Sequence, residues 1–284
     1  MSLGVLNNIS AIYAQNSLSN TRANLSKTLQ QLSSGSRINS GADDAAGLAV
    51  ADGLAANVTA LSQSTRNASD ATGLLQTADG ALSQVTSLLN RAVTLATQAA
   101  NGTLSTSQVS SANQEYQNIL TQIGNIGSTT NFNGTSVFSS TARNFFVSDG
   151  TTAGSSTYSD TVGTLSASSV GTTSGGGGVD FTASSISSLS ASSATSVLTA
   201  LTSAIGDVAY QRGTLGADIN QLASAQSVAA SEQTNLTAAE DSIRATDYGQ
   251  AASNLSKYQV LSQTGISALA QANSVQQEVT KLLQ

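Results

Sequence analysis

The chain of 284 residues contains no cysteine, no histidine and no proline. Without cysteine it has no disulfide and no thiolate metal site. Without histidine it lacks the commonest general base and metal ligand, and the HExxH zinc-protease motif is impossible. Neither GxGxxG nor GxxxxGK[ST] occurs. The sequence therefore predicts no enzyme, and no catalytic, cofactor-binding or metal site.

Charged residues are also scarce, at 9% of the chain, whereas an ordinary soluble domain carries about 25%. The formal net charge is -6, and the ten basic residues are scattered along the length. No basic cluster predicts binding to nucleic acid or to an anionic membrane. No stretch approaches the roughly eighteen apolar residues of a membrane span, so we expect no membrane segment.

Apolar residues recur at a spacing of seven in both halves of the chain. The first row consists of Leu54, Leu61, Ala68, Leu75, Leu82, Leu89 and Ala96. The second row consists of Leu201, Val208, Leu215, Leu222, Ala229, Leu236 and Ile243. A strict seven-residue period keeps an apolar seam facing a partner when helices wind around one another with left-handed supercoil. The fold class is therefore mainly α: an antiparallel coiled-coil-like helical rod built from the N- and C-terminal halves.

Between the two rows the pattern first continues and then changes. Residues 110–127 carry apolar residues at helical spacing and predict a shorter helix packed along the two long ones. Asn133-Gly134, between Phe132 and Val137, is a strong hairpin signal. From residue 148 to residue 196 Ser, Thr and Gly dominate. This composition predicts at most a small, solvent-facing β-like excursion in the middle.

The two ends of the chain also carry apolar rows. The first is Ala11, Leu18, Leu25 and Leu32, and the second is Leu255, Tyr258, Leu261, Ala268, Ala272, Val275, Val279 and Leu282. Both segments are rich in Asn, Ser and Gln, which are mediocre helix formers. We expect these end segments to need a partner surface in order to fold.

One stretch breaks the helical pattern before the first long row. Gly35 and Gly41 permit backbone angles that a helix interior refuses, and Asp43 or Asp44 can cap the next helix. Arg37 lies near this carboxylate pair in sequence. From the residues alone, an ordinary solvated turn is the simpler interpretation, because exposed ion pairs contribute only about 0 to 1 kcal/mol.

Several separated motifs resemble those of bacterial flagellin. They are LSSGSRINSGADDAAGLAVADGL (residues 32–54), LNRAVTLATQAANGT (89–103), NFNG (131–134) and AAEDSIRATDYGQAASNLSKYQVLSQTGISALAQAN (238–273). The resemblance implies a structural subunit that is exported unfolded by the flagellar type III apparatus. Such a subunit polymerises into the extracellular flagellar filament for motility.

The resemblance also implies a division of the chain. Residues 1–34 and 254–284 would form the filament core, residues 35–43 and 244–253 linkers, residues 44–140 and 195–243 a helical shell with a small hairpin, and residues 141–194 a short surface-exposed variable region. The core-forming positions are Leu18, Leu25, Leu32, Leu261, Ala268, Ala272, Val275, Val279 and Leu282. The linker positions are Arg37, Asp43, Asp44, Arg244 and Asp247, and we expect Arg37, Arg244, Asp241 and Asp247 to pair across the linkers.

The implied partners are copies of the chain itself, an export chaperone, the filament cap, hook-junction proteins and a vertebrate Toll-like receptor, with no nucleic acid, membrane or cofactor. The receptor positions are Arg91, Leu95 and Glu115. The chain departs from the family pattern at Asn90 and Gln221, which predicts weakened recognition. From the residues alone, a second interpretation is equally favoured, in which Arg91 is an ordinary exposed side chain and Leu95 an ordinary core residue, with no receptor role for either.

The sequence is also compatible with two other functions. A hook-filament junction protein has flagellin-like ends, and a secreted coiled-coil adhesin would share the long helices. The intact linker motif and the C-terminal tail favour the filament subunit over the junction protein. An adhesin should carry more charge beside its apolar seam.

Glycines interrupt the shell helices at positions 124, 127, 206, 213 and 216. They indicate either close packing and local breaks or a hinge between two helical packings. Close packing is the commoner reason for glycine in a helical pattern.

Overall fold

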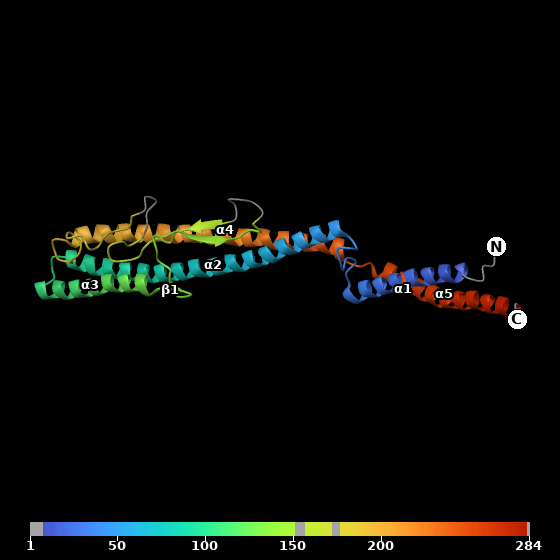
Figure 1. Cartoon of the computed structure of the whole chain (residues 1–284). Helices are drawn as coiled ribbons and strands as arrows, with labels where there is room; N and C mark the ends of the chain where they lie inside the picture. The colour runs from blue at the N-terminus through green and yellow to red at the C-terminus, as the bar shows by residue number, and fades with distance from the viewer. Residues whose placement is uncertain (1–7, 151–156, 172–176, 283–284) are drawn as a thin grey trace. The chain divides into compact units, whose positions relative to one another are not determined.

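The structure, a computed structural model, describes residues 8–150, 157–171 and 177–282. The helices are α1 (Ile9–Ser34), α2 (Ala45–Ala100), α3 (Thr106–Thr129), α4 (Ala194–Arg244) and α5 (Tyr248–Leu282). The strands are β1 (Asn131–Phe132), β2 (Thr135–Ser136), β3 (Arg143–Phe146) and β4 (Thr157–Asp160). Long helices with a few short strands confirm the predicted mainly α class (Figure 1).

The chain divides into two compact units. The terminal unit contains residues 1–56 and 235–284, and the central unit contains residues 57–234. The division falls within α2 and within α4 rather than at a helix end.

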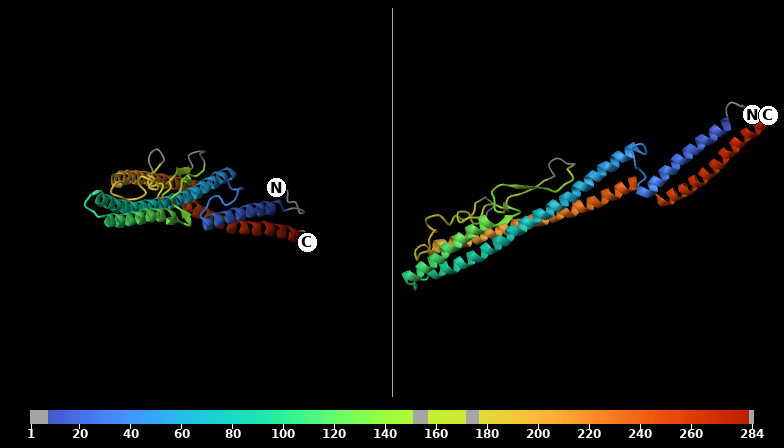
Figure 2. Two further views of the ribbon diagram at one scale, coloured as in Figure 1. Left: turned by 90° about the vertical axis from the view of Figure 1, so that its left-hand side faces the viewer. Right: turned by 60° about the horizontal axis from the view of Figure 1, so that its bottom comes forward.

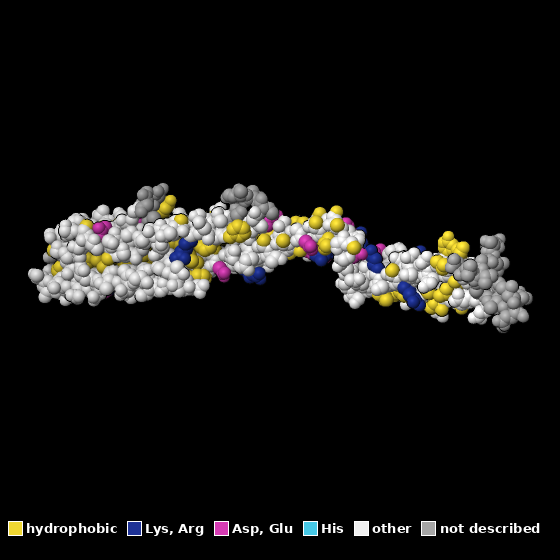
Figure 3. All heavy atoms as spheres, in the orientation of Figure 1, with side chains coloured by type: hydrophobic (Ala, Val, Ile, Leu, Met, Phe, Trp, Pro, Cys, Tyr) yellow, Lys and Arg dark blue, Asp and Glu magenta, His cyan; other side chains and the backbone are white. Residues whose placement is uncertain are grey.

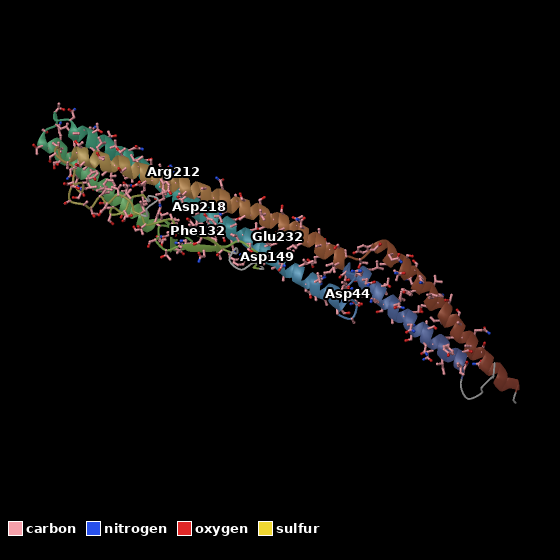
Figure 4. All side chains as sticks on the ribbon, turned by 90° about the horizontal axis from the view of Figure 1, so that it is seen from above. Asp44, Phe132, Asp149, Arg212, Asp218 and Glu232 are labelled. Carbon is pink, nitrogen blue, oxygen red and sulfur yellow. The ribbon has the colours of Figure 1, made fainter. Side chains whose placement is uncertain are left out.

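Three helices build the core of the central unit. The sequence rows form its seam: Leu61, Leu75, Leu82 and Leu89 of α2 are no more than 1% exposed, and Leu201, Leu215 and Leu222 of α4 no more than 2%. Helices α2 and α4 run antiparallel, since Arg212 pairs with Asp79 at 2.7 Å while Gln226 donates to Ser69. Figure 4 labels Arg212 on α4. The predicted third helix, α3, completes the core with Tyr116, Ile119, Leu120 and Ile123.

A two-residue turn follows α3 as the sequence predicts. Strands β1 and β2 pair antiparallel, with Phe132 opposite Thr135. Asn133 and Gly134 both have positive φ, 49° and 76°, which is the backbone that a tight hairpin turn with the native strand twist requires. This hairpin lies along α2, with the Phe132 ring beside Gly73.

The Ser/Thr/Gly-rich middle segment was predicted to be a solvent-facing excursion, but the structure shows that part of it packs into the core. Its few large apolar residues are buried in the core of the central unit: Val162, Leu165, Val170, Phe181 and Leu189 are all no more than 6% exposed. Polar side chains of the helices hold its backbone. Tyr116 Oη donates to the carbonyl of Ile186 at 2.8 Å, Gln211 donates to the carbonyl of Val162, and Asn113 accepts from Leu189 N at 2.7 Å. Composition conceals this packing because the buried residues are widely separated in sequence.

The surroundings of Gly127 explain why glycine occupies this position of α3. A Cβ at this position would overlap the carbonyl oxygen of Leu165, whereas Gly206, Gly213 and Gly216 face open space. Close packing is therefore the reason for glycine at position 127 of α3. At Gly206, Gly213 and Gly216 of α4 there is room for a side chain, so packing within the subunit does not require glycine at these positions.

We predict that Gly127→Ala destabilises the central unit by about 1 to 3 kcal/mol, because the added methyl group displaces the Leu165 backbone. The matched control is Gly80→Ala in α2, where a Cβ meets nothing within 4 Å. That change should stabilise the helix by up to about 1 kcal/mol. Urea unfolding of both variants measures the two shifts, and equal shifts would contradict the packing role.

The terminal unit consists of α1 and α5 with the adjoining ends of α2 and α4. Helices α1 and α5 lie side by side in both views of Figure 2 and run antiparallel. Asn8 Nδ2 donates to the carbonyl of Ala272 at 2.8 Å near one end, Leu18 contacts Gly265, and Thr246 approaches Gln31 at the other end. Helix α5 begins at Tyr248 and so includes part of the segment expected to be a linker.

Helix α2 also differs from the sequence expectation about long apolar stretches. One 18-residue window of Ala45–Ala100 reaches a mean hydropathy of 1.3, and only 11% of it is buried. By length and composition alone this helix could cross a membrane, so the statement that no stretch approaches a span is wrong. One such helix is weak evidence for a membrane segment, because helices that pack against protein pass the same test.

Candidate assembly site at the terminal helices and linkers

The two linkers lie side by side in the terminal unit. Arg37 N donates to the carbonyl of Arg244 at 2.7 Å, and Thr246 N donates to the carbonyl of Gly35 at 3.0 Å. Ser36 and Ala245 form an antiparallel β-bridge between them. Two segments separated by about 200 residues of chain are thereby joined through their backbones.

Gly35 ends α1 and turns the chain into the first linker. Its φ is +71°, and its N–H donates to the carbonyl of Gln31 at 2.9 Å. This left-handed C-cap favours glycine because it has no Cβ. A Cβ here would also crowd the Tyr248 hydroxyl. Gly41 lies in the turn between α1 and α2, and it does so without positive φ.

Asp43 organises the first linker. Its Oδ2 accepts hydrogen bonds from Asn39 N at 3.2 Å and from the N and Oγ of Ser40 at 3.0 Å. Its Oδ1 pairs with Lys27 Nζ of α1 at 2.7 Å. The hydrogen bond from Lys27, followed by that from the Asn39 backbone, lowers the pKa of Asp43 to about 2.

The other aspartates of the linkers cap helices. Asp44 Oδ1 accepts from Gly47 N at 2.8 Å at the start of α2. Asp247 Oδ1 accepts from Gln250 N at 3.1 Å at the start of α5. A carboxylate at this position accepts a hydrogen bond from a free N–H group, and its negative charge interacts favourably with the positive end of the helix dipole. Capping by Asp44 was one of the two alternatives that the sequence left open.

The arginines do not make the ion pairs predicted for them. Arg37 Nη2 donates to the backbone carbonyl of Ile243 at 2.8 Å rather than to Asp241 or Asp247. Arg244 pairs with Glu240 at 3.2 Å and with Asp52 at 3.5 Å. The ion-pair partner of Asp43 is Lys27, a residue that no sequence pattern singled out.

We predict a pH dependence for the first linker that Asp43→Asn removes. The folded pKa of about 2 lies below the ordinary 3.8, so the stabilisation is complete above the unfolded pKa and is lost as pH falls through the folded one. The difference in urea midpoint between wild type and Asp43→Asn should therefore shrink between about pH 4 and about pH 2.

Lys27→Gln should reproduce part of the Asp43→Asn profile, because it removes one partner of the carboxylate while the hydrogen bonds from Asn39 and Ser40 remain. Lys257→Gln, which removes a lysine of α5 outside the linkers, is the control and should leave the wild-type profile unchanged. A midpoint difference between wild type and Asp43→Asn that is constant with pH would contradict the role given to the ion pair.

The predicted core-forming residues are only partly covered within one subunit. Leu18 is 7% exposed, Leu25, Leu32 and Ala272 are half-buried, and Leu261 and Ala268 are exposed. The side chains of Val275, Val279 and Leu282 lie outside the described residues. Sequence reasoning missed further exposed apolar residues on the same helices: Ile9, Ile12, Tyr13, Leu29, Val260 and Ile266. They lie outside the apolar rows read from the sequence. Hydrophobic side chains appear on this helix pair in Figure 3.

A second predicted surface lies in the central unit. Arg91 of α2 forms a bidentate pair with Glu115 of α3, at 2.6 and 3.0 Å. Hydrogen bonding to Glu115 raises the pKa of Arg91, and the same contact lowers the pKa of Glu115. Both side chains are exposed, whereas Leu95 is 3% exposed and belongs to the core. Asn90 and Gln221 are exposed.

Comparison with known proteins decides the family. The profile of the bacterial flagellin N-terminal helical region matches residues 5–143, and that of the C-terminal helical region matches residues 198–283. The chain belongs to the bacterial flagellin family. It is 32% identical to the flagellin of Listeria innocua over 283 residues, covering 97% of this chain and 98% of that protein.

Two further flagellins are similar to parts of the chain. Flagellin 1 of Proteus mirabilis is 40% identical over 144 residues, 51% of this chain and 40% of that protein. The crystal structure of Bacillus cereus flagellin superimposes with a TM-score of 0.47 at 29% identity, covering 62% of this chain and 94% of that one.

Membership of the flagellin family establishes the general function of the chain. It is a structural subunit that polymerises with copies of itself into the flagellar filament, an extracellular component of the bacterium. The hook-filament junction alternative is not favoured, because the relatives are flagellins.

Proposed function

We propose that α1 and α5 enter the filament by packing their exposed apolar faces against other copies of the chain. The observation that carries this proposal is the exposure of those faces: Tyr13 is 71% exposed, Val260 62% and Ile9 61%. Large apolar side chains left in water favour any contact that covers them. Polymerisation supplies that contact at each added subunit.

The same reasoning supports the proposed division of the chain. Residues 1–34 and 254–284 serve as the filament core, joined by the linkers 35–43 and 244–253 to the shell residues 44–140 and 195–243. Residues 141–194 cover the shell helices, with Val162 and Phe181 packed into the shell core. The linker residues Arg37, Asp43, Asp44, Arg244 and Asp247 act by holding the ends of four helices together. Their contacts are to backbone groups, caps and neighbouring charges, so the role is structural and not catalytic.

Val260→Asp tests the proposal. A carboxylate on an apolar assembly face should raise the critical concentration for elongation of filament seeds by at least about tenfold, as for a buried anchor residue. Gln263→Asp on an exposed polar position of the same helix is the control. Equal critical concentrations for the two variants would contradict the proposal.

Family resemblance further supports a route of export and several partners. We infer that the chain is secreted unfolded through the flagellar type III apparatus, with an export chaperone, and is placed on hook-junction proteins under a filament cap. The absence of proline and disulfides fits rapid refolding after export. Pull-down of the chaperone with the full unfolded chain tests the export step, and the absence of binding would contradict it.

The exposed Arg91–Glu115 pair supports recognition by a vertebrate Toll-like receptor. Arg91 and Glu115 offer charged groups on adjoining helices, and Leu95 supports them from the core beneath. Because the two charges already pair with each other, the receptor must compete for them. Asn90 stands where the family pattern has the longer amide Gln, and Gln221 stands where it has Arg, so a positive charge is missing at position 221.

We predict that Arg91→Ala lowers receptor activation by monomeric subunit by at least about tenfold, as expected for loss of an arginine anchor. Arg66→Ala removes an exposed arginine elsewhere on α2 and is the matched control. A reporter-cell dose–response curve measures both. Identical curves for Arg91→Ala and wild type would show that this surface has no receptor role.

A further inference from the structure

An open hollow of about 330 Å³ lies in the central unit between α2 and the strands. Leu74 of α2, which is 4% exposed, forms its floor. Phe132 of β1 and Phe145 of β3 also line it, and both are half-buried. Figure 4 labels Phe132 on the hairpin that forms this wall. The hollow therefore presents partly solvated aromatic rings around an apolar floor.

Two charged groups complete the lining. Asp70, exposed on α2, offers carboxylate oxygens as acceptors. Arg143 of β3 donates from Nη2 to the carbonyl of Ser136, so its guanidinium is held at the wall by the hairpin. Aromatic walls with an acceptor and a donor at the edge suit an aromatic ring that carries a hydroxyl group.

Tyr210 of α4 carries such a hydroxyl-bearing ring, and this ring is only partly buried within its own subunit. It is 48% exposed, while its neighbours Val208 and Gln211 are buried against the core. In the part of the central unit that the structure describes, the exposed aromatic side chains are Phe146 and Tyr210. Phe146 belongs to β3, beside the hollow itself, whereas Tyr210 lies on a different helix.

The placement of the two features matters for polymerisation. In Figure 1 the β1–β2 hairpin lies along α2, and α4 runs along the other side of α2. A projecting group on one face that fits a hollow on another face makes a heterologous contact, which each new copy can repeat. A contact between two identical patches would close at a dimer. A filament requires the first kind.

We propose that in the filament Tyr210 of one subunit inserts into the hollow of a second copy of the chain, with its ring between Phe132 and Phe145 and its hydroxyl donating to Asp70. The proposal rests on polymerisation of the chain and is independent of the role proposed for α1 and α5. One inserted tyrosine buries roughly 150 to 250 Å². It would act as a lateral anchor of the shell.

Chemical crosslinking tests the contact directly, since the chain has no cysteine of its own. Thr135→Cys places a thiol at the hollow, and Tyr210→Cys places one at the projecting position. Filaments that carry both should give a ladder of covalent oligomers with a short bifunctional maleimide. A mixture of the two single variants should give covalent dimers and nothing larger.

The control is Thr135→Cys combined with Val228→Cys. Val228 is 65% exposed on the same helix but lies about 27 Å from Tyr210 along α4, so it should give no ladder. Unassembled subunits should give none with either pair. Filaments of the Thr135/Tyr210 cysteine variant that form normally and give no ladder would overturn the inference, while leaving the filament function itself intact.

A second measurement does not depend on the cysteine variants assembling. Tyr210→Ala should raise the critical concentration for seed elongation by about tenfold, Tyr210→Phe by less, and Val228→Ala not at all. Circular dichroism should show all three variants folded as wild type. A critical concentration for Tyr210→Ala equal to that of wild type would also overturn the inference. Failure of the wild-type chain to elongate seeds would instead contradict the filament function.

Discussion

Deletion of residues 254–284 is expected to abolish elongation of filament seeds, while the central unit stays folded. The deletion removes most of α5, including the exposed residues Val260, Leu261 and Ile266. It also uncovers Leu18 by removing Gly265, against which Leu18 packs. Helix α1 alone contains many mediocre helix formers and is marginal without a partner.

Light scattering with seeds measures elongation, and urea unfolding followed by circular dichroism measures the central unit. The truncated chain should show no elongation at any concentration that supports wild-type growth. The central unit should keep its urea midpoint because its core lies entirely within residues 57–234. Growth of the truncated chain at the wild-type rate would contradict the role of α5 in assembly.

Phe181→Ala is expected to destabilise the central unit by about 3 to 5 kcal/mol, the usual cost of removing a buried aromatic ring. This is a large effect for a residue in a segment dominated by Ser, Thr and Gly. Phe181 is 1% exposed and belongs to the same apolar cluster as Leu82, Leu201 and Leu215. Its N–H donates to the carbonyl of Ala167, so the segment also folds against itself.

Phe146→Ala is the matched control, since Phe146 lies on β3 before the same segment and is 40% exposed. It should cost less than about 1 kcal/mol, because surface changes away from such packing have small effects. Urea unfolding gives both free-energy changes, evaluated with the same m-value, which is the slope of the unfolding free energy against urea concentration. Equal losses for the two variants would show that the middle segment is not part of the core.

The long helices were predictable because their signal is periodic. A residue every seven positions must lie on one face of a helix, and Leu61, Leu82 and Leu215 are buried where that rule places them. The hairpin was predictable for a local reason, because Asn133-Gly134 provides the positive φ values that the turn needs. Such features depend on neighbours in sequence and need no tertiary information.

The contacts between distant segments were not predictable in the same way. Val162, Val170 and Phe181 are isolated in polar sequence, so no hydrophobic periodicity predicts that they are buried. Asp43 has several cations within reach of a flexible chain, and only the folded path of α1 selects Lys27 over Arg37. Arg37 instead satisfies a carbonyl of the second linker, which no sequence pattern encodes.

The terminal rows were partly informative. Leu18 is buried as an inward-facing position, but the most exposed apolar residues, such as Tyr13 and Val260, lie outside the rows. A helix that binds partners on several sides needs apolar residues around more of its circumference than one stripe supplies. The surfaces that such helices present to other copies therefore exceed what a single period reveals.

Hydrogen exchange of the full chain, compared between the unassembled subunit and the filament, tests most directly whether the terminal helices depend on neighbouring copies. We expect fast exchange in α1 and α5 of the free subunit, slow exchange in α2 and α4 of the central unit, and strong protection of α1 and α5 in the filament. Equal protection of α1 and α5 in both states would show that these helices need no partner and do not fold on assembly.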